Sequence, residues 1–271
     1  ANSTASVKVW DVTDPVAPHE VACELNNSVM TFKAKGSQDN EFVAFDGSSF
    51  KSATFVGTVA NQNLHANKDI DYLIITHPDF LSQAQQLKEI HNEIDGLLID
   101  IVTPEMIYNE FSCGAQDIAA IRNYIKMLYD NSNFVHRIKY VLLFGDASYD
   151  YKNKNGKVCF IPTYESVASC GIDENLATDD FYVCMGDDEG DMENTSSNVD
   201  LAIGRIPVTT TEAADAMIEK IRLYLSKDDI SMNVWRNKFI FVSDDDNHSY
   251  MDYSERLIDS IGKYDNAVIV N

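Results

Sequence analysis

The spacing of apolar residues changes near residue 66 of the chain. Before that point the pattern is typical of β-strands, because Val7–Val12 alternates apolar and polar side chains and Glu41–Phe45 and Ala53–Val56 are short apolar runs. After it, apolar runs alternate with segments whose apolar residues recur at helical spacing. The pattern predicts a β-rich segment over residues 1–65, followed by an α/β region.

The α/β region contains apolar runs that are short enough for strands and are separated by amphipathic segments. The runs are Tyr72–Thr76, Leu97–Val102 and Lys139–Phe144, and the expected helices cover residues 80–94, 104–111 and 117–130. Thr103 before Pro104 is typical of an N-cap followed by proline at the first helical position. This order predicts neighbouring parallel strands with helices on both faces of the sheet.

The Lys139–Phe144 run is the expected centre of that sheet. It is apolar on both pleat faces, as a strand covered by helices on each side would be, and Gly145 and Asp146 end it. In open α/β sheets ligands bind beyond the carboxyl ends of the strands, so Asp146 is a candidate for binding or chemistry. Residues 147–199 follow as a long, loop-rich insertion, and insertions of that length usually carry function.

Regular structure is expected again after the insertion. Leu201–Ile206 predicts a strand, and Thr209 and Glu212 have the spacing of a capping box at the start of a helix. A new alternation of strand and helix then begins with the apolar run Phe239–Val242. The predicted organisation is a β-rich segment at residues 1–65, a first α/β sub-domain at 66–230, and the start of a second, catalytic sub-domain, truncated, at 231–271.

Individual polar residues in these segments have expected roles. Arg205, in the predicted strand, is expected to pair with a buried carboxylate such as Asp200 or Asp146. Asp244–Asp246 is interpreted as the start of a helix, because acidic groups there favour the helix dipole. His77 follows a predicted strand beside a proline, and we interpret it as a polar turn residue rather than as a general base.

The composition of the chain argues against several classes of protein. The formal net charge is −22, from 43 acidic and 21 basic side chains, and such a surface repels phosphate backbones, so nucleic acid is not an expected partner. No apolar run reaches the length of a membrane-spanning helix. The five cysteines contain no C-x-x-C pair, which argues against a structural zinc site. Whether Cys159 and Cys170 form a disulfide stays open at this point.

The acidic run Asp187–Glu193 is a candidate for a structural calcium ion. Asp187, Glu189 and Asp191 alternate along it, and carboxylates two residues apart can converge on a hard cation. The run is not an EF-hand, because Gly190 stands at the fourth position. The competing interpretation is a solvated acidic loop.

Taken in order, these motifs resemble the gingipain family of cysteine peptidases. The matching residues are Tyr72–Thr76, Tyr140–Asp146, Ile161-Pro162, Thr178–Tyr182, Asp200–Val208, Trp235 and Phe239–Asp244. Val9–Pro15 and Asn61–His65 add a narrower resemblance, to the gingipain-like sortases of the type IX secretion system. The family resemblance covers residues 66–271.

The resemblance implies a caspase-like α/β catalytic unit and a Cys–His dyad whose His is followed by Gly. None of the six histidines in this chain is followed by Gly, so no catalytic residue is carried over. The dyad is expected beyond Asn271, and the chain by itself is expected to be inactive. The resemblance also implies that Asp179 is the carboxylate of the primary specificity pocket, and that either Glu165 or Asp146 orients the catalytic His.

For a sortase of this kind, the implied reaction is cleavage of the C-terminal signal of exported cargo and transfer of the cargo to anionic lipopolysaccharide. The implied partners are exported proteins that carry the signal and other type IX secretion components. The implied place is the outer membrane or cell surface of a bacterium of Bacteroidetes type, and no cofactor is required. Two other interpretations are a non-catalytic cell-surface binding module with the same fold and a secreted gingipain-like protease.

Overall fold

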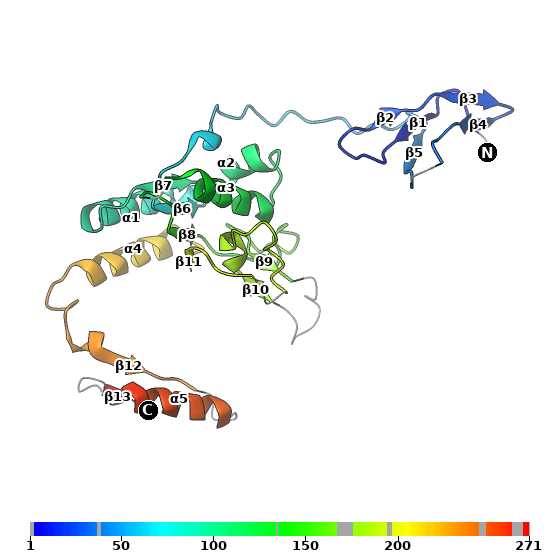
Figure 1. Ribbon diagram of the computed structural model, residues 1–271. Coiled ribbons are helices and arrows are strands. Elements are labelled where there is room, and N and C mark those ends of the chain that lie inside the picture. Colours follow the sequence, from blue (N-terminus) through cyan, green and yellow to red (C-terminus); the bar gives the residue numbers. More distant parts are fainter. Residues whose placement is uncertain are drawn as a thin grey trace. The chain divides into compact units, whose positions relative to one another are not determined.

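The structure of the protein is a computed structural model. It describes residues 3–36, 39–133, 135–166, 176–193, 197–243, 248–261 and 268–270. The chain divides into two compact units, Ala1–Ala60 and Asn61–Asn271. The order of their elements can be followed in Figure 1.

The first unit is built from β-strands alone in its described part. Its antiparallel sheet has β1 (Lys8–Asp11) between β2 (His19–Glu20) and β5 (Phe42–Phe45), and a separate hairpin joins β3 (Cys23–Asn26) to β4 (Val29–Phe32). The hairpin turn is Asn27-Ser28, and both residues have positive φ, as a two-residue turn of type I′ requires. The β-rich character expected from the sequence is therefore present.

One strand predicted in this unit is wrong. Ala53–Val56 has no regular structure, and its side chains Phe55 and Val56 are 81% and 97% exposed. An apolar run becomes a strand only when a neighbouring strand satisfies its backbone groups and a core covers one face. Neither condition holds for this segment among the described residues.

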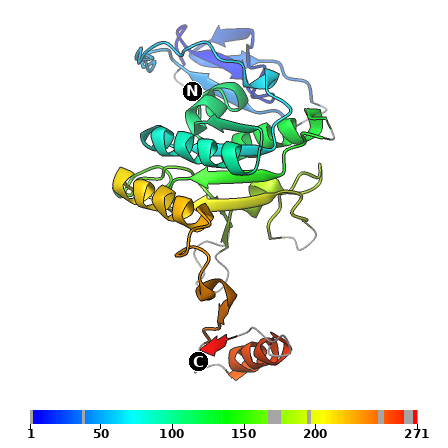
Figure 2. The ribbon, with the colours of Figure 1, turned by 90° about the vertical axis from the view of Figure 1, so that its left-hand side faces the viewer.

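The second unit is organised around a four-stranded parallel sheet. The strand order is β11 (Ala202–Ile206), β8 (Tyr140–Phe144), β6 (Tyr72–Thr76) and β7 (Ile99–Val102). β8 pairs in parallel with both β6 and β11, so it is an inner strand as its apolar sequence predicted, and Figure 2 shows β8 and β11 side by side. The predicted α/β fold class, with parallel pairing of the three expected strands, is confirmed.

Helices cover both faces of this sheet. On one face α2 (Pro104–Phe111) and α3 (Ile118–Asn131) pack on Leu73, Ile75, Val141 and Leu143, whose side chains alternate along β6 and β8. On the other face α1 (Leu81–Ile94) and α4 (Thr211–Leu225) pack on Ile74, Leu142 and Phe144. The two faces use successive residues of the same strands, which is why these strands are apolar throughout.

The helix starts follow from local sequence. Thr103 accepts a hydrogen bond from the Met106 amide and Asp117 accepts one from the Ala119 amide, so each is the N-cap of the helix after it. The predicted capping box at Thr209 is shifted by one residue, because Thr210 is the residue whose side chain accepts from the Ala213 amide. No helix in the described part is long and apolar enough to span a membrane.

Short elements complete the second unit. They are η1 (Leu64–Ala66), η2 (Pro78–Phe80), β9 (Tyr164–Glu165), β10 (Ala177–Thr178), η3 (Asp180–Val183) and η4 (Val234–Asn237). Further along, β12 (Lys238–Ile240) pairs in parallel with β13 (Val268–Val270), and α5 (His248–Ile261) lies between them in sequence. Asp244–Asp246 lies outside the described residues, and a sub-domain boundary near residue 230 stays a prediction.

Candidate functional site

The carboxyl end of β8 begins a network that joins several distant segments. Gly145 and Asp146 continue the pairing with the β11 side, since their amides donate to the carbonyls of Ile206 and Val208. The Asp146 carbonyl in turn accepts from the amides of Phe160 and Ile161. The chain therefore leaves the sheet after Asp146 and returns to the same place at Phe160.

Arg205 of β11 is the centre of this network. Its Nε and Nη2 donate to the two carboxylate oxygens of Asp179 at 2.8 and 2.7 Å. Its remaining hydrogen bonds go to the carbonyls of Gly145, Ile161 and Pro162, at 2.9, 2.9 and 3.2 Å. The guanidinium thus connects the end of β8, the returning loop and the segment before η3.

The partner expected for Arg205 was wrong. Asp200 instead accepts from the Met185 amide at 2.8 Å, and the Asp146 carboxylate accepts from the Ala147 amide at 3.0 Å. Asp179 lies far from Arg205 in sequence, in a part of the chain where no periodic pattern indicates the course of the backbone. The sequence alone could not indicate the pairing of Asp179 with Arg205, because it depends on how the insertion folds back onto β11.

Tyr182, in η3, adds two hydrogen bonds to the network around Arg205. Its hydroxyl donates to the Pro162 carbonyl at 2.6 Å, and its amide donates to the Asp179 carbonyl at 3.0 Å. The side chain is fully buried, and burial raises the pKa of its phenol well above the usual value. The Pro162 carbonyl is therefore held both by Tyr182 and by Arg205.

Glu165 lies beyond Pro162, in a pocket. β9 and β10 pair so that Glu165 is opposite Ala177, and burial raises the pKa of the Glu165 carboxyl. The pocket, of about 300 Å³, is lined by Gln116, Asp117, Ile118, Tyr151, Pro162, Thr163 and Glu165. Among the described residues no hydrogen-bond donor reaches the Glu165 carboxylate.

Cys159 lies close to these carboxylates, which the sequence did not indicate. Its half-buried thiol interacts electrostatically with Arg205, Glu165 and Asp146, and burial raises its pKa. The structure therefore places Asp146, Glu165 and Asp179 around the same end of the sheet. The roles given to them by the family resemblance stay predictions. Cys170 lies outside the described residues, so its pairing with Cys159 also stays a prediction.

The other thiols and the imidazoles have separate surroundings. Cys184 is buried and its thiol donates to the Asp180 carbonyl at 3.3 Å, whereas Cys113 is exposed. His77 accepts from the Asp79 amide at 3.3 Å and meets the Phe160 ring edge-on at 4.9 Å, which suits the turn role expected for it. In the part of the chain that the structure describes, no thiol is hydrogen-bonded to an imidazole.

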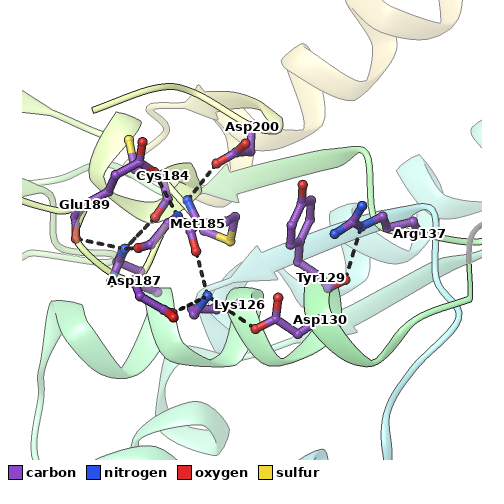
Figure 3. A network of polar contacts seen from close by, with 11 residues as sticks. Lys126, Tyr129, Asp130, Arg137, Cys184, Met185, Asp187, Glu189 and Asp200 are labelled. Atoms are coloured by element: carbon purple, nitrogen blue, oxygen red, sulfur yellow. Dashed lines mark hydrogen bonds and ion pairs between the residues drawn. The ribbon is translucent and has the colours of Figure 1, made fainter. Parts of the chain in front are cut away.

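The acidic run is held against α3 by basic side chains, as Figure 3 shows for Lys126. Lys126 donates to the Met185 carbonyl at 2.6 Å and pairs with Asp187 and Asp130 at 3.1 and 3.3 Å. Arg122, one turn earlier in α3, donates to the carbonyls of Cys184, Gly186 and Glu189 at 2.6, 3.0 and 3.0 Å. Two cationic side chains thus occupy the space next to these carbonyl oxygens.

The three candidate calcium ligands do not share a centre. Asp187 pairs with Lys126, Glu189 accepts from the amides of Gly186 and Asn198, and the Asp191 side chain accepts from the Glu193 amide. Among the described residues no group of three or more His, Cys, Asp or Glu is arranged to hold a metal ion. Calcium binding by this run stays a prediction.

Comparison with known proteins defines the class of protein. Residues 65–270 match peptidase family C25. The chain therefore belongs to this family, the gingipain family of cysteine peptidases.

Two solved structures are similar to this chain. The crystal structure of dimeric latent PorU from Porphyromonas gingivalis matches with a TM-score of 0.72 and 27% identity, over 87% of this chain and 23% of that one. The complex of the RgpB pro- and mature domains, also from Porphyromonas gingivalis, matches with a TM-score of 0.50 and 15% identity, over 73% of this chain and 41% of that one. The RgpB likeness shows the fold alone.

One curated relative also matches. It is an uncharacterized protein of Archaeoglobus fulgidus, 27% identical over 154 residues, which are 57% of this chain and 35% of the relative. The chain thus spans about a third of that protein and about a quarter of the PorU chain.

Proposed function

We propose that this chain is part of a cysteine peptidase that acts as a sortase of the type IX secretion system. The proposed reaction removes the C-terminal signal of exported cargo and transfers the cargo to anionic lipopolysaccharide. The observation that carries the proposal is the likeness to PorU, which extends over 87% of the chain at 27% identity. The likeness to PorU covers more of the chain than residues 65–270, which match the family as a whole.

The carboxyl end of the sheet is the proposed place for cargo. It has a pocket of about 300 Å³, and Glu165 in it has no hydrogen-bond donor among the described residues. A carboxylate with a raised pKa beside a pocket is suited to orient an imidazole or to accept a proton donor. We assign Glu165, rather than Asp146, the role of orienting the catalytic His, because Glu165 lines the pocket and Asp146 is not one of its lining residues.

The chemistry follows that of thiol peptidases. A thiolate attacks the scissile carbonyl, the C–N bond breaks as the leaving amine takes the proton held by the imidazolium, and an acyl-thioester forms. An acceptor amine then attacks the thioester, gives up a proton to the imidazole and releases the thiolate. None of the six histidines of this chain is followed by Gly, so no residue of the chain is assigned as nucleophile or base.

A second candidate is a non-catalytic binding module with the same fold. It would use the same pocket, of about 300 Å³, at the carboxyl end of the sheet. Such a module would still bind cargo at the pocket but would release no signal peptide.

The test uses the full-length protein and a reporter that carries a C-terminal secretion signal. Mass spectrometry measures release of the signal, and a gel shift measures attachment of the reporter to lipopolysaccharide. Glu165→Gln should lower signal release by roughly 10²-fold or more, because a misoriented base loses most of the rate. Glu93→Gln, an exposed carboxylate of α1, is the matched control and should leave release unchanged. A wild-type protein that binds the reporter and never releases its signal would establish the binding module instead.

A further inference from the structure

The ion pair between Asp179 and Arg205 uses two of the guanidinium donors and engages both carboxylate oxygens of Asp179. Both oxygens of the Asp179 carboxylate accept from the guanidinium, at 2.7 and 2.8 Å. A guanidinium has five N–H donors, and Arg205 makes five hydrogen bonds: two to Asp179 and one each to Gly145, Ile161 and Pro162. The side chains are 13% exposed for Arg205 and 22% exposed for Asp179.

This saturation matters for substrate recognition. A positively charged substrate group that took over the two Asp179 oxygens would displace the guanidinium and leave a largely buried Arg205 without its counter-charge. Since the pair carries no net charge, it also exerts little attraction on a cation at a distance. Asp179 is therefore poorly suited to bind a basic substrate side chain.

The same ion pair holds one wall of the pocket in place. Arg205 holds the carbonyls of Ile161 and Pro162, and Pro162 is itself a wall of the pocket that contains Glu165. Asp179 fixes the direction of the guanidinium, because a bidentate carboxylate pair allows little rotation. Gly145, at the end of the inner strand β8, is bound to the same guanidinium.

We propose that Asp179 is a positioning residue: it acts through Arg205 to fix the Pro162 wall of the pocket, and it does not contact the substrate. Selection for or against positive charge in the substrate then does not depend on Asp179. The inference rests on the proposed function for its activity tests and on the described contacts alone for its structural test.

The activity test compares Asp179→Asn and Arg205→Lys in the full-length protein. The substrates are paired peptides that differ only in the residue before the cleaved bond, Lys or Arg in one and Gln in the other. Rates are expressed per folded molecule, so that a variant that is only less stable shows no change in kcat/KM. Both variants should lower kcat/KM for the two peptides by the same factor, within twofold. A loss at least tenfold larger for the basic peptide in Asp179→Asn alone would overturn the inference.

Asp180→Asn is the matched control, because Asp180 is the neighbouring carboxylate and is exposed. It should leave the rates for both peptides unchanged. In addition, millimolar benzamidine, a small amidinium, should not compete with the substrate of the wild-type protein. Competition that disappears in Asp179→Asn would contradict the inference, and this measurement also serves if Arg205→Lys does not fold.

A structural test separates failure of this inference from failure of the proposed function. Hydrogen exchange on this chain should show faster exchange of the amides at residues 160–166 in Asp179→Asn than in Asp180→Asn. If the full-length protein cleaves no peptide, the proposed function fails, and this exchange result still decides the inference. Equal exchange in the two variants would overturn it.

Discussion

At the end of β8, the backbone of Gly145 has φ of +149°, a conformation that side chains rarely adopt. A Cβ at this position would lie 2.9 Å from the Cβ of Phe160, and that contact cannot relax by rotating a flexible side chain. We expect Gly145→Ala to lower the free energy of unfolding by about 1–3 kcal/mol, from strain and overpacking together. Urea denaturation of the 271-residue chain measures it.

Gly204 on the adjacent strand β11 is the control for this prediction. Nothing lies within 4 Å of a Cβ built there, so Gly204→Ala should be neutral or slightly stabilising. If the two variants had the same stability, Gly145 would not be constrained by the returning loop.

At the residue scale, the sequence indicates candidates better than it indicates their partners. Asp146 is a candidate because it ends an apolar strand, and its role stays a prediction; the need of Arg205 for a carboxylate partner could be predicted because an arginine in a strand requires a counter-charge. The partner Asp179 and the proximity of Cys159 could not be predicted, since both belong to the insertion at residues 147–199, which has no periodicity. Such contacts depend on how a long loop returns to the sheet.

The segment before the sheet is anchored to α2 by Glu110. Its carboxylate accepts from the Leu64 amide at 2.7 Å, from Gln62 at 2.9 Å and from the His65 ring at 2.6 Å, and the His65 ring stacks on Phe111. Burial by itself would raise the pKa of Glu110, but these donors outweigh it and lower the pKa to about 2 from the ordinary 4.5. Glu110 therefore joins η1 to α2 as an ion over most of the pH range.

The pH dependence of stability follows from that shift. Because the folded pKa lies below the unfolded one, the stabilisation is fully present above pH 4.5 and is lost as the pH falls towards 2. We expect Glu110→Gln to cost about 1.5–3 kcal/mol at pH 7, the range for hydrogen bonds to a charged group. The difference between wild type and variant, measured by urea denaturation, should shrink steadily from pH 4.5 to pH 2. A difference that stays constant over this range would show that the charge of Glu110 plays no part.

At the element scale, helices and inner strands follow from periodicity, and the helix N-caps Thr103 and Asp117 follow from residue type. The acidic run shows the limit of this reasoning. Its alternating carboxylates suggest a cation, but side chains of α3 supply the positive charge: Lys126 pairs with the Asp187 carboxylate, and Arg122 donates to the Glu189 carbonyl. Their positions on α3 are ordinary for solvent-facing residues, so nothing in the sequence connects them to the run.

At the scale of the whole molecule, the parallel sheet could be predicted because buried strands are apolar on both faces. Ala53–Val56 was predicted wrongly for the same reason: an apolar run has the same composition whether or not a neighbouring strand pairs with it. The strand order β11-β8-β6-β7 required the structure. Periodicity determines which segments are strands, whereas order depends on the crossovers between them.

The last prediction concerns the reactivity of the whole chain towards thiol reagents. Burial raises the pKa of Cys159 and Cys184, and the thiolate is the reactive form, so both should be slow to react at neutral pH. Cys113 is exposed and should react with iodoacetamide at least about tenfold faster than Cys184. Peptide mapping by mass spectrometry measures the order of labelling.

The same arrangement predicts how the chain responds to a thiol-directed peptide inhibitor. A catalytic thiolate needs a base within hydrogen-bond reach, and no thiol in the described part is bonded to an imidazole. We therefore expect no stoichiometric labelling of a single cysteine that depends on the peptide sequence, and no peptide cleavage by the 271-residue chain alone. Cys113→Ser should remove the labelling of this residue and leave the labelling of Cys159 and Cys184 unchanged. Sequence-selective labelling of Cys159 would contradict the prediction, because it would show that the charge of Arg205, which favours the thiolate, outweighs the burial of this thiol and the neighbouring charge of Glu165.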